Sequence, residues 1–194
     1  AQQDAPVVTS ARAAGLVILG KTAMDEGALG ASGQAPGFPP CENPLRPGFT
    51  PGGSSSGSAA AVAASFCALA LGTDTMGSVR IPAACCGVAG LKPTAGLIPR
   101  TGVLSLSATL DCIGVLAHHP RDAATMMSLL AGFDPEDLLS VEAPADWRPG
   151  LRGGGATLRA AQKVGILDHE AFAPLDPAVG DAFVAACAAL EASG

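Results

Sequence analysis

The 194-residue chain contains no tyrosine and only one tryptophan, and charged side chains make up 14% of its residues. Ordinary globular proteins carry roughly 25% charged residues. Together with the apolar fraction of 48%, this indicates a globular chain with one core of ordinary size. The sequence has no basic run and a net charge of −6, so its charge pattern favours neither a nucleic-acid partner nor an anionic membrane surface.

Segments that would span or cross a membrane are also missing. No apolar run reaches the roughly 18 residues that a bilayer span requires, because residues 59–75 are rich in alanine, poor in large side chains and run into Asp74. Residues 1–4, AQQD, do not resemble a signal peptide. We therefore expect a protein with no membrane association, and a chain that begins within a longer protein.

The six cysteines form no CxxC pair and show no Cys/His spacing typical of a metal site. Several of them lie in apolar runs, which is typical of reduced, buried thiols. Reduced thiols favour a cytoplasmic location. The sequence gives no indication of a metal or a cofactor.

Apolar patterns predict helices and strands that alternate along the chain. The predicted helices cover residues 5–15, 58–66 and 176–194, the last with Asp176 as its N-cap, and the predicted strands cover 16–22, 68–72 and 163–167. Residues 114–132 are predicted to form a strand that turns at Pro120 into a helix. This alternation predicts an α/β fold whose mixed, mostly parallel sheet carries helices on both faces.

Two long stretches have little periodicity. Residues 134–162 are rich in proline, glycine and arginine and are predicted to form loops. Residues 27–53 form a Gly/Pro-rich connection, and connections of that length inside a domain are usually functional or partly disordered.

A Ser/Gly stretch, GGSSSGSAAA at 52–61, has three possible interpretations: a phosphate-binding loop, a nucleophile elbow or a flexible linker. A phosphate-binding loop would need lysine where Ser58 stands. A nucleophile elbow would place Ser55 at the centre of GxSxG after a buried strand, but the preceding RPGFTP contains two prolines. A flexible linker would not run directly into the start of a predicted helix. None of the three interpretations fits the stretch well.

A second serine follows in LGTDTMGSVRIPAACCGVAGLKPTAG, residues 71–96. Gly72 and Gly77 permit a tight turn whose consecutive backbone N–H groups can point at one spot, as in an oxyanion hole. Ser78 at the end of that turn is a candidate nucleophile. A serine hydroxyl needs a base, and no histidine lies near Ser78 in sequence.

GGSSSGSAAAVAA and LGTDTMGSVRIPAACCGVAGLKPT together resemble the signature region of the amidase signature family of serine hydrolases. The segments LVILGKTAMDEGALG and TLDCIGVLAH resemble its flanking segments, so the resemblance covers roughly residues 4–132. It implies that residues 1–194 are part of a single amidase signature domain.

The resemblance also implies a Ser-Ser-Lys triad and an acyl-enzyme mechanism that cleaves a carboxylic amide to an acid and ammonia or an amine. Ser78 matches the nucleophile, and Ser54 matches the bridging serine on a cis peptide that relays protons. Backbone N–H groups match the oxyanion hole. The residues that carry them are Thr75, Met76, Gly77 and Ser78. A neutral lysine can act as the base for such a site.

The sequence departs from the family pattern at three points. Ser56 and Met76 stand where the family usually has glycine, and the Met76 side chain lies where it would shape acyl-group preference. The family's catalytic lysine lies further upstream than Ala1, and Lys21 matches a different lysine of structural role. We therefore expect the chain on its own to show little or no turnover.

Arg80 is a weaker candidate, for binding a substrate carboxylate, and an ion pair with Asp74 or Asp111 is the preferred alternative. The departures at Ser56 and Met76, with the adjacent pair Cys85 and Cys86, favour a stand-alone amidase acting on a small-molecule amide, which is the main interpretation. The alternatives are the A subunit of a tRNA-dependent amidotransferase, which releases ammonia from glutamine, and a non-catalytic remnant. The sequence leaves a homo-oligomer open.

Overall fold

The computed structural model describes residues 3–143, 164–166 and 175–192, which belong to two compact units, Ala1–Leu151 and Arg152–Gly194. The second unit contains one described helix, α5 (Pro177–Ala192). The Asp176 carboxylate accepts a hydrogen bond from the Ala178 N–H at 2.9 Å, as the predicted N-cap requires. None of the described helices combines the length and apolar character of a membrane span.

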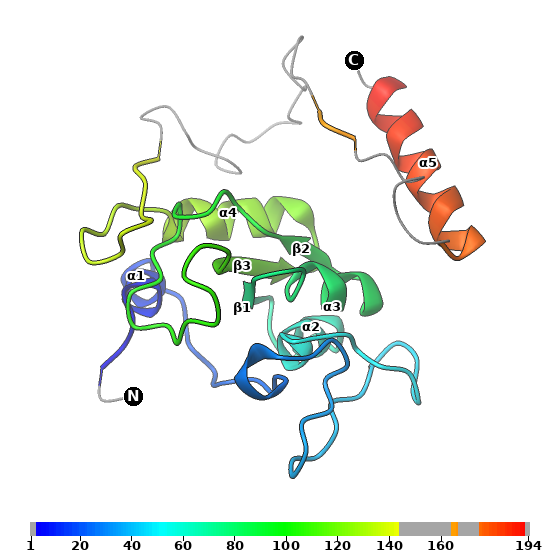
Figure 1. Ribbon diagram of the computed structural model, residues 1–194, viewed down its shortest axis with the longest axis horizontal. Helices are drawn as coiled ribbons and strands as arrows, with labels where there is room; N and C mark the ends of the chain where they lie inside the picture. Colours follow the sequence, from blue (N-terminus) through cyan, green and yellow to red (C-terminus); the bar gives the residue numbers. More distant parts are fainter. Residues whose placement is uncertain (1–2, 144–163, 167–174, 193–194) are drawn as a thin grey trace. The chain divides into compact units, whose positions relative to one another are not determined.

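The first unit contains the remaining elements (Figure 1). In chain order they are α1 (Pro6–Ala13), the 3-10 turn η1 (Glu26–Ala28), α2 (Ser56–Ala63), β1 (Leu69–Asp74), α3 (Arg80–Cys85), β2 (Ala89–Leu91), β3 (Cys112–Ala117) and α4 (Pro120–Leu130). The three strands form one sheet in the order β1-β3-β2. The predicted helices at 5–15, 58–66 and 120–132 thus correspond to α1, α2 and α4.

The direction of the strands differs from the sequence-based expectation. Both β1 and β2 pair antiparallel with β3, from Leu69 opposite Ala117 and from Ala89 opposite Ala117. Because both outer strands oppose β3, they run in the same direction, with α3 between them in the chain. The strands predicted at 68–72 and at the start of 114–132 correspond to β1 and β3, whereas the short strand β2 was not predicted. The expected mostly parallel sheet is not confirmed in the described part of the chain.

Helices lie on both faces of this sheet (Figure 1). β3 is buried along its whole length and alternates between two cores. Ile113 and Val115 pack with α1 and α4, whereas Leu116 packs with Val62 of α2 and Ala83 of α3. Period-2 alternation of apolar side chains allows one strand to serve both layers.

Three sequence-based predictions remain: a strand at 16–22, a strand at 163–167 and loops at 134–162. The structure contradicts the first and describes only part of the other two. Residues 16–22 form no strand, and Val17 and Leu19 expose 81% and 72% of their surface. An apolar run becomes a strand only when another strand pairs with it, and none of the described strands does. Residues 164–166 are likewise not in a strand, and 134–143 contain neither helix nor strand. The rest of 134–162 and of 163–167 falls outside the described residues.

Candidate active site

Two glycines that face each other across β1 and β3 form the floor of the site. Gly72 pairs with Gly114. A Cβ at Gly72 would lie 2.6 Å from Ser55 Oγ, and one at Gly114 would lie 2.7 Å from the Leu91 carbonyl oxygen and 3.1 Å from Val79 Cγ2. Contacts that short are repulsive, so only glycine lets Ser55 and Val79 approach the sheet this closely. The two serine-bearing loops therefore meet directly above the strands.

Ser54 lies at the centre of the first loop and is completely buried. The peptide bond between Gly53 and Ser54 is cis. The Ser54 carbonyl oxygen accepts a hydrogen bond from the Asp25 N–H at 3.1 Å. The Ser54 hydroxyl is buried as well, and within the described residues it has no hydrogen-bond partner. Buried hydroxyls are rarely left unpaired, so this one is available for a group that the described residues do not supply.

The neighbouring serine hydroxyls behave differently, because each donates to a backbone carbonyl. Ser55 Oγ lies 3.3 Å from the Thr73 oxygen, Ser56 Oγ lies 3.5 Å from the Ala23 oxygen, and Ser58 Oγ lies 2.7 Å from the Leu71 oxygen. These contacts hold the loop and the first turn of α2. Among the four serines of this stretch, only Ser54 has a hydroxyl that makes no structural hydrogen bond to the described residues.

The second loop, residues 74–80, is organised around the buried carboxylate of Asp74. It accepts hydrogen bonds from the backbone N–H groups of Gly77 at 2.8 Å, Val79 at 3.1 Å and Arg80 at 3.3 Å. The Arg80 guanidinium adds two more, at 2.9 and 3.0 Å. Burial alone would raise the pKa of Asp74, but the bonds from Arg80 and the Val79 N–H outweigh it and lower that pKa.

Arg80 therefore forms the ion pair that the sequence analysis preferred, with Asp74 as its partner. Its side chain remains 52% exposed. Its Nε and Nη2 atoms both donate to Asp74, and nothing in the described residues supports a contact between Arg80 and a substrate carboxylate. That weaker role stays a prediction.

The N–H groups of the predicted oxyanion hole fall into two kinds. Gly77 donates to Asp74, whereas the N–H groups of Thr75, Met76 and Ser78 have no hydrogen-bond acceptor within the described residues. Gly77 has a φ of +132°, a conformation that favours glycine. Ser78 is half-buried, and the Met76 side chain is 82% exposed. Three of the four N–H groups thus have no acceptor in the described part of the chain.

The two loops are joined by one backbone hydrogen bond, from the Ser55 N–H to the Ser78 carbonyl oxygen at 3.1 Å. Residues 24 positions apart in sequence, Ser54 and Ser78, are thereby brought to adjoining loops, as the helix and strand between them require. Lys21 is exposed, and neither it nor Lys92 bonds to either serine in the described part of the chain. The described residues therefore bring two candidate catalytic groups together without a base.

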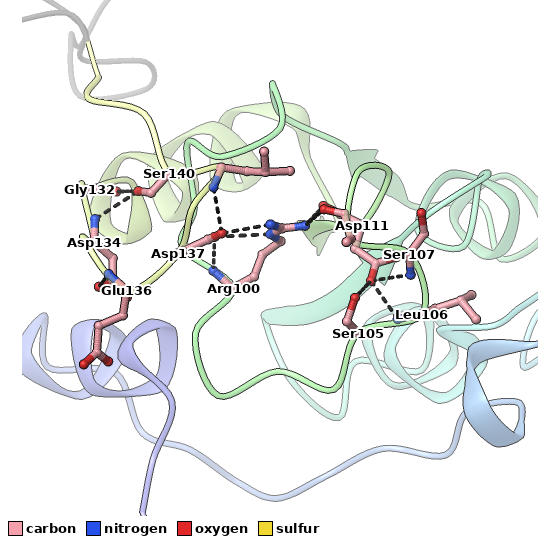
Figure 2. Close-up of polar contacts among 12 residues, drawn as sticks. Arg100, Ser105, Leu106, Ser107, Asp111, Gly132, Asp134, Glu136, Asp137 and Ser140 are labelled. Carbon is pink, nitrogen blue, oxygen red and sulfur yellow. Dashed lines mark hydrogen bonds and ion pairs between the residues drawn. The ribbon is translucent and has the colours of Figure 1, made fainter.

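A cavity of about 550 Å³ adjoins the second loop and includes Thr75 and Asp111 in its lining. Thr75 Oγ1 donates to Asp111 Oδ1 at 2.6 Å. Burial alone would raise the pKa of Asp111, but the bonds from Thr75 and Ser107 N–H, among others, lower it. Figure 2 shows the Arg100 side chain lying between Asp137 and Asp111. The sequence analysis named Asp111 as a partner for Arg80, but its carboxylate binds Thr75 instead.

Sequence reasoning missed the role of Asp25. This buried residue donates its N–H to the Ser54 oxygen, and its carboxylate accepts the Gly33 N–H at 3.2 Å. The available signal was an acidic residue followed by several glycines, at the start of a connection already suspected of function. Asp25 joins that connection to the Ser54 loop.

Comparisons with known proteins agree with this geometry. The amidase family model matches residues 1–194. The A subunit of glutamyl-tRNA(Gln) amidotransferase from Desulforapulum autotrophicum is 44% identical over 194 residues, which cover 98% of this chain and 39% of that protein. The chain thus spans well under half the length of this relative.

Two solved structures are similar in fold as well. The A subunit of glutamyl-tRNA(Gln) amidotransferase from Thermotoga maritima has a TM-score of 0.70 and 44% identity, covering 75% of this chain and 32% of that one. The 6-aminohexanoate cyclic dimer hydrolase, complexed with substrate, has a TM-score of 0.71 and 40% identity, covering 77% and 31%. A family match along the whole chain, with two serine loops in one site, shows that the chain belongs to the amidase family.

Proposed function

We propose that this chain is part of a longer, single-domain amidase that cleaves carboxamides through an acyl-enzyme on Ser78. The observation that carries the proposal is the buried Ser54 hydroxyl, which no described residue pairs, on a loop that is hydrogen-bonded to the Ser78 loop. A hydroxyl that only stabilised the loop would be paired, as those of Ser55 and Ser58 are. An unpaired hydroxyl in that position suits a proton relay.

In the proposed reaction, Ser78 Oγ attacks the amide carbonyl carbon while its proton passes through Ser54 Oγ toward a base. The resemblance implies that this base is a lysine upstream of this chain. The tetrahedral oxyanion is held by the uncommitted N–H groups of Thr75, Met76 and Ser78, and Gly77 would have to share its N–H with Asp74. The C–N bond then breaks, the nitrogen leaves with the relayed proton, and water hydrolyses the acyl ester to regenerate Ser78.

For the substrate, we propose glutamine, with the full-length protein acting as the A subunit of a tRNA-dependent amidotransferase. The support is the curated relatives, which carry that name at identities such as 49% and 44%. They favour this alternative over the stand-alone amidase that the departures at Ser56 and Met76 suggested. The stand-alone amidase remains a second candidate because a cyclic dimer hydrolase is similar at a TM-score of 0.71.

Ammonia release by the full-length protein separates these candidates. We expect glutamine to be hydrolysed, faster with a co-purifying partner protein, and Ser78→Ala to reduce the rate by on the order of 10³-fold or more. Rapid cleavage of simple aliphatic amides without any partner would instead favour the stand-alone amidase. Absence of turnover on every amide, with or without a partner, would favour the remnant. The 194-residue chain alone is expected to release little or no ammonia, because no lysine bonds to Ser54 or Ser78 in the described part of the chain.

A further inference from the structure

We propose that Asp111 is a positioning residue that holds the Thr75 side chain, and through it orients the Thr75 backbone N–H toward the oxyanion. The inference rests on the proposed function, because it assigns a role within the same site. It concerns the hydrogen bond between Thr75 Oγ1 and Asp111 Oδ1, which at 2.6 Å is the shortest side-chain contact made by the 74–80 loop. A short hydrogen bond to an ionised carboxylate is among the stronger kinds.

The carboxylate of Asp111 is held in place by hydrogen bonds other than the one from Thr75. Its other oxygen, Oδ2, accepts three hydrogen bonds, from Ser105 Oγ at 3.0 Å, the Leu106 N–H at 2.8 Å and the Ser107 N–H at 2.9 Å. These donors all belong to one short loop, as Figure 2 shows. Because Oδ2 is held from three directions, the carboxylate cannot rotate freely, and Oδ1 is left facing Thr75.

The loop that carries Asp111 is itself anchored by Arg100. Arg100 Nη1 donates to the backbone carbonyl oxygen of Ala108 at 2.9 Å and to that of Asp111 at 3.4 Å. Its other nitrogens pair with Asp137 at 2.8 and 3.2 Å, and the two side chains are only 15% and 4% exposed. A bidentate, mostly buried pair of this kind is geometrically specific. Asp111 therefore acts from a fixed support.

Thr75 connects that support to the candidate oxyanion hole. On its N-terminal side, Asp74 holds the N–H groups of Gly77 and Val79. Nothing in the described residues accepts the Thr75 N–H, so its direction depends on how the Thr75 side chain and backbone are held. The bond to Asp111 supplies that restraint. Misplacing a catalytic group by about 1 Å can lower a rate by roughly 100-fold, so a small rotation of this peptide is enough to affect catalysis.

The test uses the full-length protein and the hydrolysis of its amide substrate. Thr75→Val removes the hydroxyl while keeping the shape, and Thr75→Ser keeps the hydroxyl. We expect Thr75→Val and Asp111→Asn each to lower kcat by about tenfold or more with KM little changed, and Thr75→Ser to retain most of kcat. The double variant is expected to be no slower than the slower single variant, because both remove one contact. Thr109→Val, a threonine on the same cavity wall with no side-chain hydrogen bond in the described residues, should leave kcat at the wild-type value.

The inference is overturned if Thr75→Val keeps wild-type kcat, if the two single losses simply multiply in the double variant, or if Thr109→Val causes an equal loss. Should Asp111→Asn fail to fold, judged by its thermal midpoint, the contrast between Thr75→Val and Thr75→Ser decides the question alone. Ser78→Ala separates the two proposals. Full activity in Ser78→Ala refutes the proposed function, whereas its inactivity beside an unaffected Thr75→Val refutes only the role of Asp111.

Discussion

The two serine-bearing loops, residues 52–58 and 74–80, are built on the same sheet but treat their polar groups in opposite ways. In the first loop the hydroxyls of the neighbouring serines are bound to backbone carbonyls, and one buried hydroxyl, that of Ser54, has no partner among the described residues. In the second loop a buried carboxylate, Asp74, accepts hydrogen bonds from backbone N–H groups, while the N–H groups of Thr75, Met76 and the half-buried Ser78 have no acceptor in the described part of the chain. The roles proposed for Ser54, as a fixed proton relay, and for Ser78, as an accessible nucleophile, would need these two different environments.

The largest effect is expected within the first loop, when its serine hydroxyls are removed one at a time. We expect Ser54→Ala to lower the amidase rate of the full-length protein by about 10²–10⁴-fold, the usual contribution of a positioned proton-transfer group. Ser56→Ala, two residues away, removes only a weak bond at 3.5 Å and is expected to change the rate far less. Steady-state ammonia release measures both variants. Near-normal turnover in Ser54→Ala would show that the unpaired hydroxyl has no catalytic role.

The first loop also depends on a close backbone approach at Gly57. Its N–H donates to the Ala23 oxygen at 2.9 Å, and a Cβ at this position would lie 2.5 Å from the Ala23 nitrogen. Gly57→Ala should therefore lower the free energy of unfolding by roughly 1–3 kcal/mol through overpacking, against a gain of about 1 kcal/mol in helix propensity. The clash should win because backbone atoms cannot rotate away.

Gly132→Ala is the matched control for this prediction, since a Cβ at Gly132 meets nothing within 4 Å and its φ is not positive. Denaturant unfolding of the two variants and the wild type gives the comparison. A Gly57→Ala variant as stable as Gly132→Ala would mean that the 52–58 loop does not depend on its contact with Ala23.

The support of the second loop should depend on pH through the ion pair between Arg100 and Asp137. The hydrogen bond from the Arg100 guanidinium lowers the pKa of Asp137 to about 2. Because the folded pKa lies below the ordinary value of about 3.9, the pair stabilises the fold fully above that value, and its contribution is lost as the pH falls through about 2. The difference corresponds to on the order of 2 kcal/mol.

We therefore expect Asp137→Asn to lower the free energy of unfolding at pH 7, with the gap to wild type narrowing between about pH 4 and pH 2. Urea unfolding of both proteins across that range measures the gap. A gap that stays constant down to about pH 2 would show that the loss comes from packing and not from the charge of Asp137.

The sequence predicts the candidate residues of this site, but not the strand pairing and long-range hydrogen bonds that hold them. Motif order selected Ser54 and Ser78 as candidates, which the structure places on adjoining loops, and the N-cap signal of Asp176 and the turn at Pro120 located two helices. The sequence could not show that β3 separates β1 from β2, because strand direction depends on which strands pair and local patterns do not record pairing. The bond between Thr75 and Asp111 was out of reach for the same reason: it joins residues 36 positions apart.

Two residues carried the sequence-based interpretation of the protein as a stand-alone amidase. Ser56 and Met76 replace glycines of the family pattern, and this tilted the prediction toward a stand-alone amidase. In the structure Ser56 is a buried residue with a weak hydrogen bond, and the Met76 side chain is largely exposed. Our preference for the amidotransferase proposal rests on the names of the curated relatives and not on these two positions.

The most direct test of the central claim is covalent labelling of the full-length protein with a serine-directed fluorophosphonate, followed by mapping of the modified peptide. The account predicts one adduct, on Ser78, which disappears in Ser78→Ala and forms more slowly in Ser54→Ala. Labelling that persists in Ser78→Ala, or amide hydrolysis that continues in that variant, would contradict the assignment of Ser78 as the nucleophile.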